Sequence, residues 1–278
     1  MERILVPCDF SEQATHAFRT ALSFADIASE IHLLHVIELP VLHDAVLMPV
    51  LSYEEDLFRE IEHKAVAAFE KMTIEENVKN RPVTTKVVYG GTSRMILDYV
   101  IDQRIDLVIM GTKGATGMKE IVVGSNTEKI VRGSPVPVLA VRTAITREDV
   151  KDIVFPNMLQ TENQEDLVMH VKALQDFFKA KLHIVWINTP THFESDITTR
   201  RRLKAFCERF MLTNYSINIY NDLFEEQGVI NFAHAIQADL VAMGTHGRKG
   251  LAHVFAGSVT EDIVNHIDIP IWTYTLTY

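Results

Sequence analysis

Two glycine-rich loops carry the residues best suited to chemistry in this sequence. The first follows the apolar segment Asp106–Met110 and has the spacing Gly111-x2-Gly114-x9-Gly124-Ser125. A loop that leaves a parallel strand and enters a helix points backbone N–H groups outward, and the N-terminal end of the helix adds partial positive charge. Glycine lets the backbone take positive φ and approach an anion closely. The spacing therefore predicts a phosphate-binding loop, with the Ser125 hydroxyl as a further donor.

The second loop repeats this spacing as Gly244-x2-Gly247-x9-Gly257-Ser258. In both copies the serine opens a Ser-x-x-Glu pattern, which is a capping box at a helix start. A purely structural role in turns and caps is therefore an alternative for each loop. The first loop is not a Walker A motif, since Met118 stands where the lysine would be, and its Gly-x-x-Gly-x-x-Gly spacing is not the dinucleotide fingerprint. The repetition favours phosphate binding by the repeated unit.

The segments around the first loop alternate between strand and helix patterns. Asp9-x-x-Glu12 indicates the start of the first helix, and the apolar segment from Leu39 to Ser52 is typical of a loop or lid. Short apolar or β-branched runs predict strands, and apolar residues at helical spacing predict helices. The expected strands are Arg3–Pro7, Ile31–Ile37, Val83–Tyr89, Asp106–Met110 and Pro135–Arg142, and the expected helices are Ala14–Ala28, Tyr53–Val78, Ser93–Gln103 and Ser125–Arg132.

The same order then recurs in the second part of the chain. The expected strands are Asp152–Pro156, Leu182–Ile187, Tyr215–Tyr220, Asp239–Met243 and Pro270–Leu276, with helices from Thr161 onward, at Phe193–Leu212 and at Val229–Gln237. Strands that alternate with helices imply a parallel, doubly wound sheet. We infer an internal duplication of an α/β unit. The polar stretch Thr143–Val150 predicts the boundary, which gives domains at residues 1–146 and 147–278.

Composition limits the class of protein. The chain has 278 residues, of which 47% are hydrophobic, so it can bury a sizeable core. Its formal charge of −10 argues against nucleic acid or an anionic membrane as a general partner. The two cysteines, Cys8 and Cys207, exclude a disulfide framework, and Cys8 is expected to be a buried, small apolar residue rather than a redox sensor. We expect a soluble, cytoplasmic protein without a membrane span.

Three motifs together resemble the universal stress protein family. They are Gly-x2-Gly-x9-Gly-Ser after a strand, Val-Pro-Cys-Asp-Phe-Ser-Glu at the end of the first strand, and Leu-Leu-His-Val in the second. The resemblance covers nearly the whole chain, once per half. It implies two tandem Rossmann-like domains, each a five-stranded parallel sheet of order 3-2-1-4-5 flanked by helices. It also implies ATP as the ligand, alone or with Mg²⁺, in the crevice between strands 1 and 4.

The resemblance also assigns roles to single residues of the first half. Asp9 would hold the nucleoside, while Pro7 and Val36 would line the adenine slot. Met110 and Gly111 would form its back wall. The phosphates would lie against Gly114, Gly124, Ser125, Asn126 and Thr127. Asn126 replaces the valine common in the family, although its backbone N–H would still be available. A second, weaker site would comprise Gly244, Gly247, Gly257, Ser258 and Thr260.

The second half departs from this pattern in two positions. Asn157 is expected at the position of Asp9, and aligning IHLLHVIELP with KLHIVWINTP places Trp186 at the position of Val36. An amide lacks the carboxylate charge, and an indole ring could fill the adenine slot. We therefore expect ATP binding to be weak or lost in the second half. The alternative is that Trp186 turns into the core and Asn157 substitutes for the aspartate.

These observations favour an ATP-binding regulatory protein of the stress response. No Ser-His-Asp arrangement, metal-ligand spacing or carboxylate pair can be read from the sequence, so catalysis is absent or limited to slow ATP hydrolysis. The alternatives are an ATPase and a binder of another small ligand, apolar or acyl, in the divergent second half with Trp186 in its wall. The resemblance further implies that the last strands of the two halves pair in an intramolecular pseudo-dimer. The whole chain could then form a homodimer.

Overall fold

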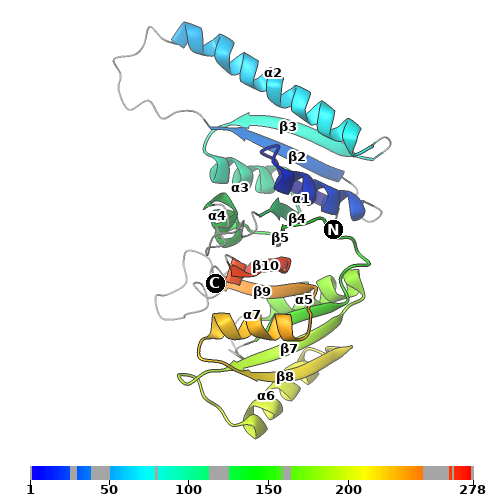
Figure 1. Cartoon of the computed structure of the whole chain (residues 1–278), viewed down its shortest axis with the longest axis vertical. Helices are drawn as coiled ribbons and strands as arrows, with labels where there is room; N and C mark the ends of the chain where they lie inside the picture. The colour runs from blue at the N-terminus through cyan, green and yellow to red at the C-terminus, as the bar shows by residue number, and fades with distance from the viewer. Residues whose placement is uncertain are drawn as a thin grey trace.

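The computed structural model describes residues 2–25, 30–38, 51–78, 81–112, 125–157, 159, 164–246, 263–264 and 266–276. The side chains of residues 51–57, 125 and 246 are not among the parts described. Within these ranges the chain forms one ten-stranded sheet covered by helices on both faces (Figure 1).

The first half of the chain builds a parallel sheet with the strand order β3-β2-β1-β4-β5. Its strands are rich in Ile, Leu and Val because both faces are covered by helices. Its elements in chain order are β1 (Arg3–Pro7), α1 (Glu12–Ser23), β2 (Glu30–Ile37), α2 (Leu51–Glu75), β3 (Val83–Tyr89), α3 (Thr92–Asp102), β4 (Leu107–Gly111), α4 (Ser125–Gly133) and β5 (Val138–Val141).

The second half repeats this arrangement as β8-β7-β6-β9-β10. Counted within each half, both strand orders are 3-2-1-4-5, so the expected fold of two tandem Rossmann-like units is confirmed. The elements are β6 (Asp152–Pro156), α5 (Glu165–Phe178), β7 (Lys181–Asn188), α6 (Asp196–Arg209), β8 (Tyr215–Asn221), α7 (Glu225–Ala235), β9 (Leu240–His246) and β10 (Ile271–Leu276).

The two halves are joined edge to edge. β5 pairs with β10 in antiparallel orientation, with Leu139 opposite Trp272, and every other strand pair in the sheet is parallel. We call this pairing the β5–β10 seam. At one end of the seam, the Thr245 and Thr275 hydroxyls both donate to the carbonyl oxygen of Val131 in α4, at 3.4 Å and 3.2 Å. The last strand of each half is therefore an interior strand of the complete sheet.

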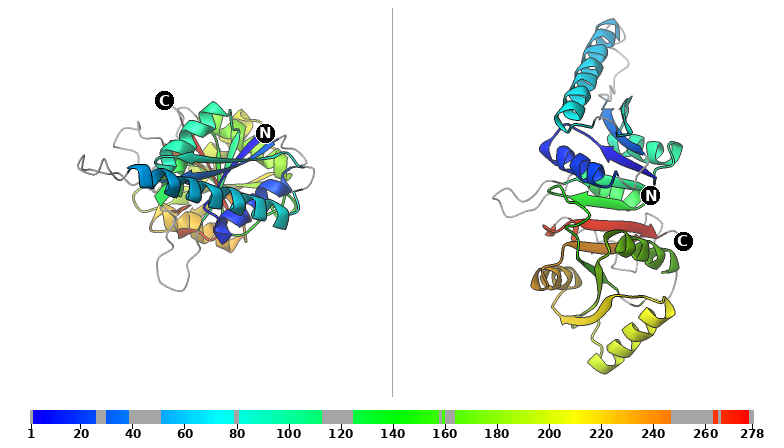
Figure 2. Two further views of the ribbon diagram at one scale, coloured as in Figure 1. Left: turned by 90° about the horizontal axis from the view of Figure 1, so that it is seen from above. Right: turned by 90° about the vertical axis from the view of Figure 1, so that its right-hand side faces the viewer.

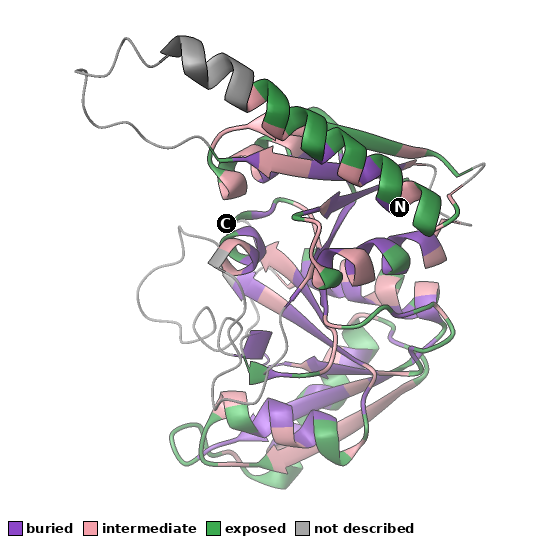
Figure 3. Ribbon diagram, turned by 45° about the horizontal axis from the view of Figure 1, so that its top comes forward, coloured by how far each residue is buried: buried purple, intermediate pink, exposed green. Residues whose placement is uncertain are grey.

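The hydrophobic core consists of two layers, one on each side of the sheet. Helices α1, α2, α5 and α6 cover one face, called the α1 face, and α3, α4 and α7 cover the other, called the α3 face. The sheet twists strongly from one edge to the other. Helices that cover the same face therefore lie on opposite sides of the right-hand view in the two halves (Figure 2). Buried residues concentrate along the strands and on the inner sides of the helices (Figure 3).

The connection between the halves is attached to the first one. Ile145 is buried, its N–H donates to the Thr20 hydroxyl at 3.1 Å, and its carbonyl oxygen accepts from Ser23 at 3.0 Å. Both partners belong to α1. The residues around the expected boundary at 146 thus pack against the first half before the chain enters β6.

Candidate functional site

The strand order reverses between β1 and β4, and the residues expected to bind a nucleotide lie at the carboxyl ends of these strands. β1 ends at Pro7 and β4 ends at Gly111, and the two strands pair directly through Leu5 and Val108. In open α/β sheets, ligands bind at this kind of switch point. Val36 lies on the neighbouring β2, close to the same edge of the sheet, and packs against the core layer of the α3 face.

Asp9 is exposed and held in a defined turn. Its Oδ1 accepts the N–H of Ser11 at 3.0 Å, and Phe10 between them has a φ of 63°. Ser11 is the N-cap of α1, because its hydroxyl accepts the N–H of Ala14 at 3.2 Å. The expectation that Asp9 itself opens the helix is therefore wrong. Asp9 instead fixes the loop before the cap through its hydrogen bond with Ser11.

Gly111 is required by close packing between β4 and α1. A Cβ atom added at this position would lie 2.1 Å from the backbone oxygen of Gln13. Met110, one residue earlier, is buried. Gly111, the first glycine of the predicted phosphate loop, thus has a structural role. It lets the first turn of α1 pack closely against β4 beside the switch point.

Two of the residues expected to contact phosphate, Asn126 and Thr127, have described side chains at the start of α4. The Asn126 Oδ1 accepts the Ser93 hydroxyl at 2.9 Å, which ties α4 to the first turn of α3. Thr127 is buried in the same helix turn. The expected contacts at Gly114, Gly124, Gly247, Gly257, Ser258 and Thr260, and the side chain of Ser125, lie outside the described residues.

The backbone pairing of the second half corrects one expectation. The Cys8 N–H donates to the Leu34 oxygen, and the Asn157 N–H donates to the Val185 oxygen in the same way. Asn157 therefore corresponds to Cys8 and not to Asp9. The register is supported by the next described residue, because Leu159 has a φ of 54°, matching Phe10.

The same pairing corrects the position of Trp186. Because Leu34 corresponds to Val185, the residue equivalent to Val36 is Ile187, and Trp186 corresponds to His35. The Trp186 ring belongs to the core on the α1 face, whereas Ile187 belongs to the core on the α3 face, as Val36 does. The indole therefore turns into the core under α6 and does not occupy the position of the adenine slot.

The Asn157 side chain nevertheless makes the same kind of turn as Asp9. Its Oδ1 accepts the N–H of Leu159 at 2.7 Å. Its amide nitrogen lies 3.4 Å from Gln164 Oε1. In the loops after β1 and β6, a side-chain oxygen accepts the backbone N–H of the residue two positions later. The acceptor is Asp9 in the first half. In the second half it is Asn157, which corresponds to the residue before Asp9.

Both cysteines are buried, and burial raises the pKa of each thiol to about 11. Cys8 Sγ lies 3.9 Å from the Met72 sulfur in the core, as expected for a small apolar residue. Since the thiolate is the reactive form, a raised pKa predicts slow reaction near neutral pH. We expect an aromatic disulfide reagent to label neither cysteine in the folded protein and both in urea. Labelling of Cys8 in the folded state at the rate seen in urea would contradict this.

The structure brings together a polar chain that the sequence did not reveal. Asp152 Oδ1 lies 2.6 Å from His183 Nε2, and His183 Nδ1 lies 2.9 Å from the Ser216 hydroxyl. These residues come from β6, β7 and β8, and no sequence spacing could indicate their contact. The Asn218 amide donates to the Ser216 hydroxyl at 3.0 Å. Each member is thus held by its neighbours, which joins three strands at a half-buried position.

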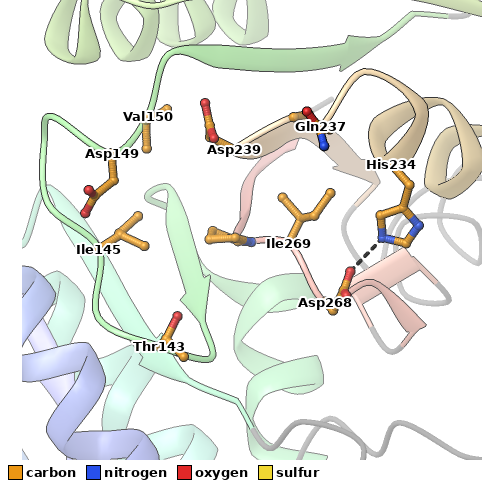
Figure 4. Close-up of a pocket in the computed structure, with 11 residues that line it drawn as sticks. Thr143, Ile145, Asp149, Val150, His234, Gln237, Asp239, Asp268 and Ile269 are labelled. Atoms are coloured by element: carbon orange, nitrogen blue, oxygen red, sulfur yellow. Dashed lines mark hydrogen bonds and ion pairs between the residues drawn. The ribbon is translucent and has the colours of Figure 1, made fainter.

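A second cluster of polar groups lines a pocket of about 430 Å³ beside the connection between the halves (Figure 4). His234 Nε2 lies 2.6 Å from Asp268 Oδ1, and this hydrogen bond lowers the pKa of Asp268. Asp149 accepts hydrogen bonds from Thr146, and Asp239 accepts two backbone N–H groups at the start of β6. The carboxylates of Asp149 and Asp239 therefore accept hydrogen bonds in a turn and at a strand end, and we assign them a structural role.

Over the residues that the structure describes, no three histidine, cysteine, aspartate or glutamate side chains are grouped so as to hold a metal ion. In the same ranges, no helix has the length and apolar character needed to cross a membrane.

Comparison with known proteins agrees with the fold. The profile of the universal stress protein family matches residues 1–142 and 225–274. A universal stress protein of Methanocaldococcus jannaschii is 32% identical over 153 residues, which cover 51% of this chain and 94% of that protein. One of Bacillus subtilis is 28% identical over 147 residues, covering 50% of this chain and 98% of that protein. Each of these relatives thus corresponds to one half of the chain.

Solved structures match over the whole length. A universal stress protein from Archaeoglobus fulgidus superposes with a TM-score of 0.69 at 18% identity and covers 98% of both chains. A putative universal stress protein from Pseudomonas aeruginosa also gives 0.69, at 16% identity, over 99% of this chain and 94% of that one. At this identity the likeness shows the shared fold.

Proposed function

Because the chain belongs to the universal stress protein family, we propose that it is an ATP-binding regulatory protein with its main nucleotide site in the first half. The observation that carries this proposal is the position of Asp9 and Gly111 at the carboxyl ends of β1 and β4, on either side of the switch point. Asp9 is exposed and already oriented by Ser11. A carboxylate in this position can accept hydrogen bonds from ribose hydroxyls.

The remaining contacts follow the family pattern. Pro7 and Val36 would line the adenine slot, and Met110 with Gly111 would form its back wall. Gly114, Gly124, Ser125, Asn126 and Thr127 would hold the phosphates, alone or with Mg²⁺. Asn126 would contribute its backbone N–H, because its side chain is bonded to Ser93. The helix start at Ser125 supports this role, since a helix N-terminus attracts anions.

We further propose domains at residues 1–146 and 147–278, with a weaker site in the second. Pro156, Ile187 and Gly244 stand where the first half has Pro7, Val36 and Gly111, so the second half would retain an apolar slot. By the same count, the sequence has Met158 at the position of Asp9. The expected loss of affinity therefore comes from a missing carboxylate. The second site would use Gly244, Gly247, Gly257, Ser258 and Thr260.

Isothermal titration with ATP tests the proposal. We expect one strong site per chain, and we expect Asp9→Asn to weaken it about tenfold or more, because hydrogen bonds to a charged group are lost. Glu12→Gln is the matched control, since it removes an exposed carboxylate three residues away in the first turn of α1. No binding by the intact chain, or equal affinity in both variants, would refute the proposal.

Regulation is favoured over hydrolysis because Asp9 would lie at the nucleoside end, far from the γ-phosphate, leaving no general base for the attacking water. A single-turnover assay with excess protein should show no conversion to ADP on the seconds timescale typical of enzymes. We also propose that the β5–β10 seam makes the chain an intramolecular pseudo-dimer, with a homodimer of whole chains as a further level of assembly. Family membership and two unpaired cysteines support a cytoplasmic location.

A further inference from the structure

A cavity of about 240 Å³ lies on the α1 face of the second half, between the start of α5 and α6. Its apolar walls are Leu159, Phe206 and Phe210. Its polar rim is formed by Gln164, Arg202 and Arg209. It is separate from the switch point, which lies between β6 and β9 in this half.

The first half has an aromatic cluster around Phe10, the counterpart of Leu159 in the cavity wall. Phe10 packs edge-on against Phe69 of α2, with ring centroids 4.9 Å apart, and against His35 at 4.7 Å. Leu159 replaces Phe10 at the matching positive-φ position. The last turns of α2 and α6 end in equivalent backbone hydrogen bonds. The Val78 N–H donates to the Thr73 oxygen, and the Leu212 N–H donates to the Cys207 oxygen. Counting back from these bonds, Leu203 of α6 corresponds to Phe69 of α2. Leucines thus stand where the first half has two phenylalanines, and one of them, Leu159, forms part of the cavity wall.

A buried hydrogen-bond donor belongs to Trp186, whose ring contacts Arg202 of the cavity wall. Trp186 replaces His35, whose ring nitrogen bonds the Cys8 carbonyl oxygen at 2.8 Å. The Trp186 Nε1 is buried and has no hydrogen-bond partner. Its ring lies under the guanidinium of Arg202, 5.6 Å from the centroid, and Arg202 forms part of the cavity wall. A buried donor without an acceptor lowers the stability of the folded protein. The packing around Trp186 is therefore not the most stable one for a hydrophobic core.

Each arginine of the rim is paired with a glutamate but retains unused N–H donors. Arg202 uses Nη1 for Glu194, at 2.9 Å from both carboxylate oxygens, and Arg209 uses Nη2 for Glu165. A guanidinium has five N–H donors in a planar fork. Neither glutamate lines the cavity. Donors of both arginines therefore remain for a carboxylate at the mouth of the cavity.

We propose that this cavity binds a small organic anion that has an aromatic or short aliphatic body and one carboxylate. The body lies against Phe206, Phe210 and Leu159, and the carboxylate meets Arg202 and Arg209. The volume of about 240 Å³ corresponds to about eight water molecules at about 30 Å³ each. The bodies of benzoate and hexanoate are of this order of size.

The test follows the indole N–H signal of Trp186 by NMR in the full-length protein, during titration with benzoate or hexanoate. The chain has only one other tryptophan, Trp272, so a Trp272→Phe sample assigns the signal. We expect saturable shifts with both anions and none with benzylamine, which has the same body and the opposite charge. Saturating ATP should leave these shifts unchanged, so a failure here is distinct from a failure of the proposed nucleotide site.

Three variants of α6 sharpen the test. Ala205 is exposed and lines the cavity, so Ala205→Phe should fill it and abolish the shifts without disturbing the core. Arg209→Met keeps most of the side-chain length and should weaken benzoate about tenfold. Arg201→Met removes an exposed charge of the same helix outside the cavity and should change nothing. Equal binding of benzylamine, full binding by Ala205→Phe, or no saturable binding would each overturn the proposal. Thermal unfolding confirms that each variant is folded.

Discussion

Gly111→Ala is expected to lower the free energy of unfolding by about 2 to 4 kcal/mol, at the upper end of the usual cost of overpacking a core. The new methyl group would lie 2.1 Å from the Gln13 oxygen, 2.3 Å from its carbonyl carbon and 2.9 Å from the Ala14 nitrogen. All three atoms are backbone in the first turn of α1. A backbone that is fixed in a helix can make room only if the whole helix start moves away from β4. Urea unfolding measures the loss.

Gly244→Ala is the matched control, because Gly244 occupies the same position in β9. There the nearest atom is the Leu167 Cδ2 at 2.7 Å, the far end of a flexible side chain. A rotation of Leu167 relieves the contact, so we expect a cost of about 1 kcal/mol or less. Equal costs for the two variants would contradict this explanation. If Gly111→Ala lost ATP binding, the fraction of folded protein would have to be measured as well, because unfolding alone abolishes binding.

Trp272→Ala is expected to cost about 3 to 5 kcal/mol, the range for truncating a large buried aromatic side chain. Trp272 is 3% exposed and lies in β10, where it pairs with Leu139 across the β5–β10 seam. It also stacks on Tyr274, with ring centroids 6.3 Å apart. The substitution removes the largest side chain of the strand that connects the halves. Unfolding in urea, followed by circular dichroism, gives the change in stability.

Phe193→Ala provides the comparison for this prediction. Phe193 is also a large aromatic residue of the second half, but it is 76% exposed. Its removal should change stability by less than about 0.5 kcal/mol. If Trp272→Ala cost no more than Phe193→Ala, the seam would not contribute to the stability of the chain in the way the burial indicates.

Most of the fold could be predicted from the sequence because the strands are short apolar runs. Val83–Tyr89 and Asp152–Pro156 match their predicted bounds, and the order of elements in both halves is confirmed. The ends of helices were less predictable. α6 begins at Asp196 rather than Phe193, because the Ser195 hydroxyl caps it by accepting the Thr198 N–H. The cap depends on one hydrogen bond, which hydrophobic spacing does not reveal.

The residue correspondence between the halves could not be predicted correctly. Pro7 and Pro156 are 149 residues apart, whereas the equivalent residues Leu34 and Val185 are 151 apart, so two residues are inserted between the first and second strands of the repeat. An alignment of the two halves by sequence alone places Asn157 at Asp9 and Trp186 at Val36. In a strand, a shift of one residue turns a side chain to the opposite face. This reversal places Trp186 on the α1 face, which no composition argument could show.

Contacts between distant strands were also invisible in the sequence. The chain Asp152–His183–Ser216 joins three strands, and the open space beside Leu159 depends on the absence of rings that the first half contains. Both features depend on the register of the strands in the sheet. Apolar patterns determine which elements form, whereas side-chain partners depend on how the strands are aligned.

The β5–β10 seam also affects how the two halves can change over time. Two separate copies of one unit would form such a seam only above a concentration set by their affinity, and every substitution would appear in both copies. Here the seam forms within one chain, so dilution does not weaken it. A substitution alters one half and leaves its counterpart unchanged. One half can therefore retain an ancestral site while the other acquires a different pocket, and Leu159 beside Trp186 is where such divergence is visible.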